Sequence, residues 1–410
     1  MPAVVGVPRM RRPAGVGPPM LGWSMTTEAG QGALGRVWQG VVNRESARVR
    51  DAFLASASPP ASGRARWGMG VAWLVVVSFA ASVLLGVWWV LVALGVGDFP
   101  RVTRGVAGFL GVMALMFAWL ALPRPYRPEG LEVSAQDAPQ LHALVARVAA
   151  EVGVSRPVRV VLNGEVNASM GLAGWRREPV LVLGLPLWWS LSPQGQVGLV
   201  AHELAHLRNG DPARGGVIGL AVSVLERLSD SLRPDTITRP KPGLVAMITN
   251  VLMTLLALLP LATVRLLAWL VGAERQAAEF RADLMAARVA GSDTVAVMLD
   301  RMHMAHLLDS ALHKQRHMPE RPHAFAEYAH MLGTLPEEQW AAQRATLGRT
   351  SLDDSHPATV DRMQVVQARP QPGTLRLTPE EAERIRLELH PFVRPIETQA
   401  QEWRQYLLHP

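Results

Sequence analysis

Cysteine is absent from all 410 residues of the chain. Its absence excludes a disulfide framework, thiolate metal ligands and a thiol nucleophile, so any bound metal ion must be held by His, Asp or Glu. Charge is also scarce, because 18% of the residues are charged, whereas soluble domains carry about a quarter. Hydrophobic residues reach 49%, and the net charge is +7. This balance favours a partner with negative charge, either an anionic membrane surface or a nucleic acid.

Two features expected of a nucleic-acid or nucleotide binder are missing. The Arg-rich segments have no interleaved aromatic residues, and the whole chain has only 3 Tyr and 8 Phe, whereas single-stranded nucleic acids are bound on stacked aromatic side chains. The sequence also has no glycine-rich phosphate loop of the form G-x-x-x-x-G-K. We therefore expect no nucleic-acid partner and assign the basic charge to lipid headgroups.

Long runs without charge support the membrane interpretation. No charged residue occurs between Arg66 and Asp98, and about 20 apolar residues suffice to cross a bilayer. A second run, 105–122, is just long enough. Residues 67–123 are therefore predicted to form a transmembrane hairpin. The preceding residues, 1–66, are basic, rich in Gly, Pro and Ala and without a sustained period, which predicts a disordered leader rather than a signal peptide.

Arginine gathers on both outer flanks of this hairpin. The leader carries nine Arg residues, and Arg124 and Arg127 follow the second run, whereas the short link holds only Arg101 and Arg104 against Asp98. Positively charged flanks stay on the cytoplasmic side of a membrane. The protein is therefore predicted to be integral to the inner or plasma membrane of the cell, with the part after the hairpin in the cytoplasm.

The rest of the chain divides into a globular part and a tail. Residues 124–370 contain short apolar runs typical of strands, at 157–162 and 179–183, among segments with helical spacing. A third charge-free run, 242–264, is interrupted by a proline and is a possible further membrane segment, with a separate helix expected around 273–290. The remaining 40 residues or so, 371–410, are predicted to be a C-terminal tail with one helix, opened by a capping box at Thr378, Pro379 and Glu381.

The most informative stretch is "VAHELAHLRNGD", residues 200–211. A helix opening at Ser192-Pro193 and stopped by Gly210 would aim His202 and His206 at one point, because residues four apart lie on the same face. Glu203 is displaced around the axis, so it would reach a water on the metal ion rather than the ion. Two such histidines with an adjacent glutamate base form the pattern of a catalytic zinc site. One Zn²⁺ per chain is expected.

A catalytic zinc needs a third protein ligand and keeps one position open for water. The metzincin continuation H-x-x-G-x-x-H is absent, since Asn209 and Pro212 stand at two of its positions. A downstream carboxylate is therefore expected. Two candidates share the spacing Glu-x-x-x-Asp, and spacing alone does not choose between them. They are Glu226 with Asp230, and Glu279 with Asp283.

Four pieces of the sequence occur in an order that resembles one known family, the M48 membrane metallopeptidases, with their HtpX-like and CAAX-protease-like members. The pieces are "NAS" at 167–169, "HELAHLRNGD" at 202–211, "RQAAEFRAD" at 275–283 and "SHPATVDR" at 355–362. The membrane hairpin ahead of them also fits the family. The resemblance implies an α+β fold that is mainly helical. It would be a membrane-anchored zincin catalytic domain of gluzincin type, with a small edge-stranded sheet.

The resemblance also implies roles for individual residues. Glu279 would be the third zinc ligand, and Asp283 would orient a ligand histidine through its free N–H. Asn167 and Ala168 would lie on an edge strand that binds an extended substrate as an added strand. His356 and Arg362 would stabilise the developing oxyanion.

The function that follows is a zinc-dependent endopeptidase acting on membrane or membrane-near proteins, in a quality-control role by analogy with the family. Two other functions stay open as alternatives. One is a CAAX-type processing protease, which would need a large intramembrane chamber with more spans. The other is a non-catalytic membrane scaffold with a structural zinc, which would not need Glu203. The sequence gives no expectation about the oligomeric state.

Overall fold

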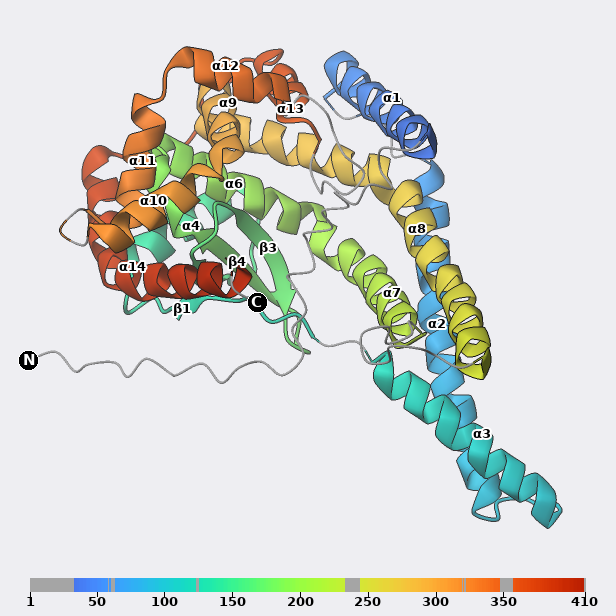
Figure 1. The fold of residues 1–410 in the computed structure, drawn as a ribbon. Coiled ribbons are helices and arrows are strands. Elements are labelled where there is room, and N and C mark those ends of the chain that lie inside the picture. The colour runs from blue at the N-terminus through green and yellow to red at the C-terminus, as the bar shows by residue number, and fades with distance from the viewer. Residues whose placement is uncertain are drawn as a thin grey trace, which may run out of the picture.

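The computed structural model describes residues 33–57, 59, 63–122, 125–232, 244–318, 320, 322–346 and 357–408. This part of the protein is mainly helical and contains one four-stranded mixed sheet (Figure 1). The strands are β1 (Leu131–Val133), β2 (Arg159–Asn163), β3 (Ala168–Ala173) and β4 (Glu178–Gly184). The helices are α1 (Ala33–Ala55), α2 (Gly63–Ala93), α3 (Arg101–Leu120), α4 (Pro139–Val152), α5 (Leu185–Ser190), α6 (Pro193–Asn209), α7 (Asp211–Leu232), α8 (Leu244–Ala290), α9 (Ser292–Arg301), α10 (Leu307–His317), α11 (Ala324–Thr334), α12 (Glu337–Thr346), α13 (Thr359–Gln367) and α14 (Pro379–Leu408).

The sheet has the strand order β1-β2-β4-β3. Strands β2 and β4 are parallel, and β1 and β3 pair antiparallel on either side of them. The predicted runs at 157–162 and 179–183 thus correspond to β2 and β4. Strand β3 lies at one edge, and no described strand pairs with its outer side.

The main core lies between the sheet and the helices that cover it. One face of the sheet presents Val160, Leu162, Leu181 and Leu183 to this core, because alternate residues of a strand point to the same side. Helix α4 adds its apolar stripe at helical spacing and ends at Gly153, whose φ of 86° is left-handed. Helix α6 contributes most of its length, and its middle is completely buried.

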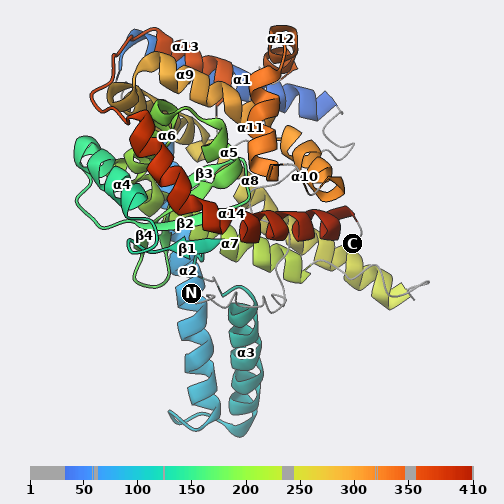
Figure 2. The same ribbon diagram turned by 90° about the vertical axis from the view of Figure 1, so that its left-hand side faces the viewer.

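Helices α2 and α3 form an antiparallel pair that projects away from the rest of the molecule (Figure 2). The two helices approach closely at Gly111, where a Cβ would lie only 2.8 Å from the backbone nitrogen of Val90. Small residues at such crossings let helix backbones pack closely in lipid. By length and composition, α2, α3 and α8 are each able to cross a membrane. The three candidate spans include the predicted hairpin.

Helix α8 is one continuous helix of 47 residues, about 70 Å long at 1.5 Å per residue. We expected an apolar run interrupted by Pro260 and a separate helix at 273–290; the structure instead carries the helix through Pro260. A proline removes one backbone hydrogen bond and bends a helix without ending it where neighbouring helices hold both sides. Here Pro260 is buried, and α8 packs along α7 and α2.

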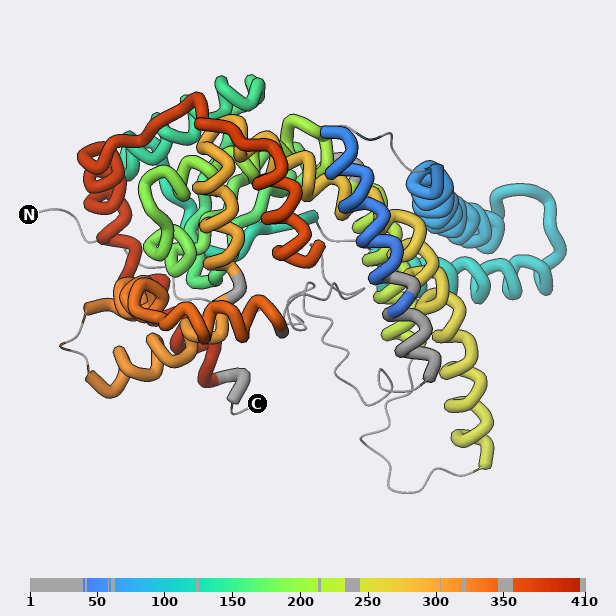
Figure 3. The backbone as a smooth tube through the Cα atoms, turned by 90° about the horizontal axis from the view of Figure 1, so that it is seen from above, coloured from blue at the N-terminus to red at the C-terminus, as the bar shows by residue number. Residues whose placement is uncertain are grey.

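The expected disorder of residues 1–66 is wrong for the described part of that segment. Helix α1 docks on α8 and α13, and Figure 3 shows it crossing above α8. Phe53 is fully buried, with its ring centroid 5.2 Å from that of Phe280. Arg50 donates a hydrogen bond of 3.0 Å to Asp361. Charged residues separate Phe53 from its partly buried neighbour Val49, so the sequence does not predict that this helix docks.

The C-terminal helix α14 is packed as part of the domain rather than as a tail. Its predicted capping box is present, since Thr378 and Glu381 bond each other's backbone N–H groups. Apolar residues such as Leu389 and Ile396 belong to the main core. Two glutamates of α14 also accept from the N-termini of other helices, Glu388 from α4 and Glu397 from α11. The helix therefore fastens two parts of the domain together.

Replacing Phe53 by alanine should release α1 from α8. Removing a buried phenylalanine costs about 3–5 kcal/mol, which corresponds to at least about 100-fold more of the detached state. The rate at which a broad-specificity protease cuts within α1 should rise accordingly. The control is Arg48→Gln, because the Arg48 side chain is 77% exposed. Equal cutting rates in the two variants would show that α1 is not held by Phe53.

Candidate metal centre

Local sequence signals define the helix that carries the His–Glu motif. Ser192 caps α6 by accepting a hydrogen bond of 3.1 Å from the backbone of Gly195, with Pro193 at the first helical position. Gly210 ends the helix in the left-handed conformation, with a φ of 73°. Both ends agree with the prediction. The helix is held rigidly by the core, so the motif side chains start from fixed positions.

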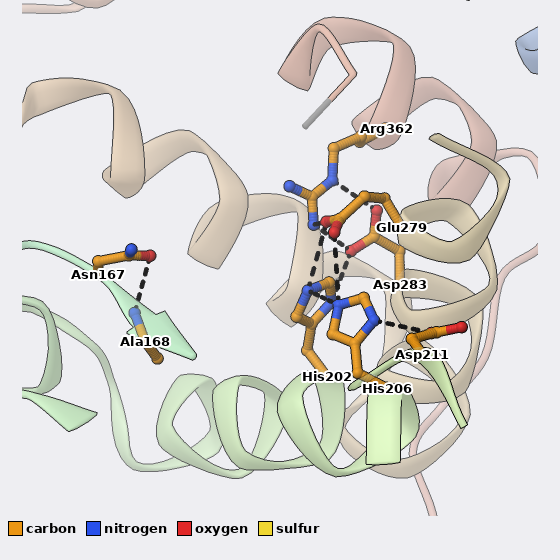
Figure 4. Close-up of polar contacts among 8 residues, drawn as sticks. All are labelled: Asn167, Ala168, His202, His206, Asp211, Glu279, Asp283 and Arg362. Carbon is orange, nitrogen blue, oxygen red and sulfur yellow. Dashed lines mark hydrogen bonds and ion pairs between the residues drawn. The ribbon is translucent and has the colours of Figure 1, made fainter. Parts of the chain in front are cut away.

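The structure brings His202, His206 and Glu279 together (Figure 4). The two histidines come from α6 and the glutamate from α8, which packs against α6. All three ligand atoms lie within 4.8 Å of one another. The two Nε2 atoms are 3.2 Å apart. The two oxygens of Glu279 each approach a different histidine, Oε2 at 3.6 Å from His202 Nε2 and Oε1 at 3.4 Å from His206 Nε2.

These separations fit the donor set of a tetrahedral zinc ion. Zinc binds imidazole nitrogen and carboxylate oxygen at about 2.0–2.2 Å, which places neighbouring tetrahedral ligands about 3.4 Å apart. The three measured separations, 3.2, 3.4 and 3.6 Å, lie around this value. His202, His206 and Glu279 would supply three of the four ligands of such an ion and would leave the fourth position for water or substrate. The residues present therefore fit a catalytic zinc.

The other ring nitrogen of each histidine faces a carboxylate. Nδ1 of His202 lies 3.0 Å from Asp283 Oδ1, and Nδ1 of His206 lies 3.0 Å from Asp211 Oδ2. A carboxylate at Nδ1 fixes the proton there, so Nε2 is left with a lone pair for a metal. Sequence reasoning missed Asp211, although it ends the "HELAHLRNGD" piece. Its signal is its place just after the helix-ending Gly210, where the chain turns back towards His206.

Arg362 makes a two-pronged ion pair with Asp283. Its Nε and one terminal nitrogen each donate to a different oxygen of Asp283 at 2.7 Å. The same terminal nitrogen lies 3.3 Å from Glu279 Oε2. Both Arg362 and Asp283 are almost completely buried. The contacts of this guanidinium are therefore with the carboxylates that surround the His–Glu cluster, as Figure 4 shows.

The electrostatics of the cluster reflect this carboxylate-rich setting. Burial lowers the pKa of His202, but its contacts with Asp283 and Glu279 outweigh burial and raise that pKa to about 10. Burial also lowers the pKa of Arg362, and the charges of Asp283 and Glu279 more than reverse this, so the guanidinium stays positive. The negative charge that attracts a proton to His202 would attract a divalent cation in the same way.

Other candidate residues lie at different places. Glu203 is buried beside His202 on α6, and its charge acts on Arg362. Asn167 immediately precedes the edge strand β3, which begins with Ala168, and both stand apart from the cluster in Figure 4. Glu226 lies on α7 and is not in the His–Glu cluster. Of the two candidate glutamates, Glu279 is therefore the one that meets both histidines. His356 lies outside the described residues.

Glycine at position 184 keeps Asn167 in place. A Cβ there would collide with the backbone oxygens of Glu165 and Asn167. The backbone N–H of Gly184 donates to the Asn167 carbonyl at 2.9 Å. The Asn167 side chain turns back onto its own strand, because its Oδ1 accepts from the Ala168 N–H at 2.9 Å. The start of β3 is therefore fixed against the end of β4.

Comparison with known proteins agrees with this architecture. The sequence profile of peptidase family M48 matches residues 135–370, more than half of the chain, so the protein belongs to this family. The protease HtpX of Psychrobacter sp. (strain PRwf-1) is 28% identical over 190 residues, which cover 44% of this chain and 58% of that protein. A protease HtpX homologue of Leptothrix cholodnii is 30% identical over 155 residues, covering 36% of this chain and 51% of the homologue.

The chain thus spans between half and three fifths of the length of these curated relatives. No solved structure matches it. The resemblance found from the four sequence pieces is confirmed at the level of the family.

Removing the carboxylate behind His206 should weaken metal binding while leaving the three donors in place. In Asp211→Asn, the imidazole loses the charge that fixes its tautomer, and we expect zinc affinity to fall about 10–100-fold. A competition titration against a zinc chelator measures this. The matched control is Asp137→Asn, since Asp137 is exposed and its side chain bonds only Ser134. Equal zinc affinity in both variants would contradict a role for Asp211.

Proposed function

We propose that this protein is a membrane-anchored, zinc-dependent endopeptidase with a gluzincin-type active site. The supporting observation is that two histidines from α6 and one glutamate from α8 meet, with their ring nitrogens and carboxylate oxygens 3.2 to 3.6 Å apart. Membership of a peptidase family and the names of the two relatives support hydrolysis of peptide bonds as the reaction. Three helices able to cross a membrane support the anchoring.

His202, His206 and Glu279 would hold the zinc ion. When bound, zinc lowers the pKa of a water molecule towards about 7 and polarises the peptide carbonyl. Two nitrogens and one carboxylate oxygen form a donor set that leaves room for water, as in the histidine–histidine–glutamate sites of other zinc peptidases. Calcium and magnesium prefer oxygen-only surroundings, so the nitrogen donors favour zinc.

Glu203 would act as the general base and then as the general acid. It follows His202 directly on α6, so its side chain leaves the helix at a different angle from the two histidines, and we propose that it reaches a water on the metal rather than the metal itself. In this role Glu203 takes a proton from the attacking water and delivers it to the amine that leaves. Burial of the Glu203 side chain keeps bulk water away from that transfer.

The surrounding ion pairs would keep the ligands in position. Asp211 and Asp283 hold the two imidazoles from behind. The contacts of Arg362 with Asp283 and Glu279 favour a positioning role for this arginine in the folded enzyme. A direct role in stabilising the oxyanion, predicted from sequence for Arg362 and His356, stays a prediction.

The substrate would bind along β3. A peptide in extended form would add to the free edge of the sheet by main-chain hydrogen bonds, starting near Asn167 and Ala168. Strand β3 packs against α6, the helix that carries the motif, so an added strand would run past the cluster. The Arg-rich flanks of the hairpin favour a cytoplasmic active site. Membrane proteins, or proteins close to the membrane, are the substrates this location favours.

Changing Glu203 to glutamine should abolish cleavage without removing the metal. Glutamine keeps the size of the side chain but cannot take up the proton, so turnover should fall by about 10²–10⁴. Casein cleavage by the purified protein in detergent measures the rate, and metal analysis of the same sample measures zinc. Cleavage by Glu203→Gln at the wild-type rate would reject this mechanism. Retained zinc with no cleavage by the wild type would favour the non-catalytic scaffold.

Changing the third donor should remove the metal as well as the activity, because both depend on it. Glu279→Gln should lose zinc and cleavage together, since a neutral amide oxygen binds zinc far more weakly than a carboxylate. Glu226→Gln is the matched control, because Glu226 has the same Glu-x-x-x-Asp spacing but lies on α7. Loss of zinc from the Glu226 variant, with zinc kept by the Glu279 variant, would reverse the assignment of the ligand.

A further inference from the structure

The turn between β3 and β4 presents one large aromatic side chain to solvent. This tip consists of residues 174–177, Gly-Trp-Arg-Arg, and Trp175 is 81% exposed. Two left-handed residues shape the turn, Gly174 with a φ of 64° and Arg177 with a φ of 53°. A non-glycine residue with a positive φ is uncommon. The turn therefore holds Trp175 outward, and the positive φ of Arg177 costs conformational free energy.

The tip is tied to the segment that leaves the membrane hairpin. The backbone N–H of Gly174 donates to the Tyr126 carbonyl at 2.9 Å. The ring of Tyr126 lies over Gly171, where a Cβ would be only 2.6 Å from the ring carbon Cε1. Tyr126 follows the C-cap of α3, Ala121, by five residues, so the chain between them spans at most about 18 Å. The tip must therefore lie close to the end of a candidate membrane helix.

The surroundings of the tip have the composition of a membrane interface. The end of α3 exposes Trp119, at 73%, and the following segment exposes Tyr126, at 46%. Trp and Tyr gather at the boundary between hydrocarbon and headgroups. Arg176 and Arg177 stand beside Trp175, and Arg156 donates to the carbonyl of Arg177 at 3.0 Å. The acidic side chain that follows, Glu178, is paired with Arg159, so the tip itself is basic.

We propose that the β3–β4 tip inserts into the headgroup layer of an anionic bilayer, with Trp175 at the hydrocarbon boundary and Arg176 on lipid phosphates. The planar guanidinium of arginine matches the geometry of a phosphate group, and anionic headgroups attract basic side chains. The tip continues the edge strand β3, so the bilayer would hold this strand at a fixed height. The enzyme would then favour substrate segments that lie close to the membrane surface. This inference rests on the membrane placement in the proposed function.

The absence of cysteine allows a clean test. Trp175→Cys, labelled with an environment-sensitive fluorophore, gives one probe in the full-length protein. The matched control is Val297→Cys, because Val297 is 56% exposed on α9, on the far side of the domain from α3 (Figure 1). Both proteins are reconstituted into vesicles of phosphatidylcholine with phosphatidylglycerol. Zinc content equal to that of the wild type shows that each variant is folded.

At position 175 the probe should emit at shorter wavelength, be quenched severalfold less by aqueous iodide and be quenched by spin-labelled lipid. The probe at position 297 should show none of these effects. In Arg176→Gln, or in vesicles of phosphatidylcholine alone, the effects at position 175 should weaken.

Two outcomes overturn the inference. One is a water-exposed probe at position 175 in protein that has entered the vesicles. The other is shielding from iodide without quenching by spin-labelled lipid, which would mean that a protein surface covers the tip. Failure of the whole protein to enter vesicles is a different result, because it would reject the membrane placement in the proposed function. Neither readout depends on peptide cleavage.

Discussion

The buried carboxylate of Asp283 is the contact on which the candidate metal centre depends. It binds Arg362 through both oxygens and also meets His202, so it joins α8 to α13 and to α6. Its side chain is completely inaccessible to water. Removing one member of such a network would leave an uncompensated charge inside the protein, which costs several kcal/mol. This cost helps to fix the spacing of the three helices α6, α8 and α13, which Asp283 joins.

The balance of charge in the site would favour a bound cation. Four carboxylates gather around the cluster, those of Glu203, Asp211, Glu279 and Asp283. Two guanidinium groups act on them, that of Arg362 through direct contacts and that of Arg275 through its charge on Glu279. An excess of buried negative charge is costly. A divalent ion at the meeting point of the two Nε2 atoms and Glu279 would offset part of that excess. The imidazoles then contribute as neutral donors, each held from behind by a carboxylate.

Some parts of this arrangement follow from the sequence because their signals are local. Ser192, Pro193 and Gly210 set the ends of α6, and the four-residue spacing sets the angle between the two histidines. The same holds for the capping box that opens α14. These features depend on residues within one or two turns of each other, where backbone geometry leaves little choice.

Other parts could not be read from the sequence, because they depend on long-range packing. The spacing of the sequence motif does not distinguish Glu226 from Glu279 as the third ligand. Only the path of α8 across α6 shows which of them meets the histidines. The same path needs Pro260 to bend a helix rather than end it, and neighbouring helices decide that. Helix α1 docks through a few separate contacts, among them Phe53 on Phe280 and Arg50 with Asp361, which leave no periodic pattern in the sequence. The contact of Asp211 with His206 depends on the direction in which the chain turns after Gly210. The functional role of Glu279 stays a prediction from the family and the geometry.

Phe280 links the N-terminal helix α1 to the helix that carries Glu279. Phe280 follows Glu279 directly on α8, and Phe53 packs against it from α1. On the same helix α1, Arg50 pairs with Asp361, the neighbour of Arg362. One N-terminal helix thus braces the element that supplies Glu279 and Asp283 and the element that supplies Arg362. Because α2 follows α1 after only a few residues, the membrane anchor and the brace are joined. A displacement of α2 would therefore reach Glu279 through packing, without any change in α6.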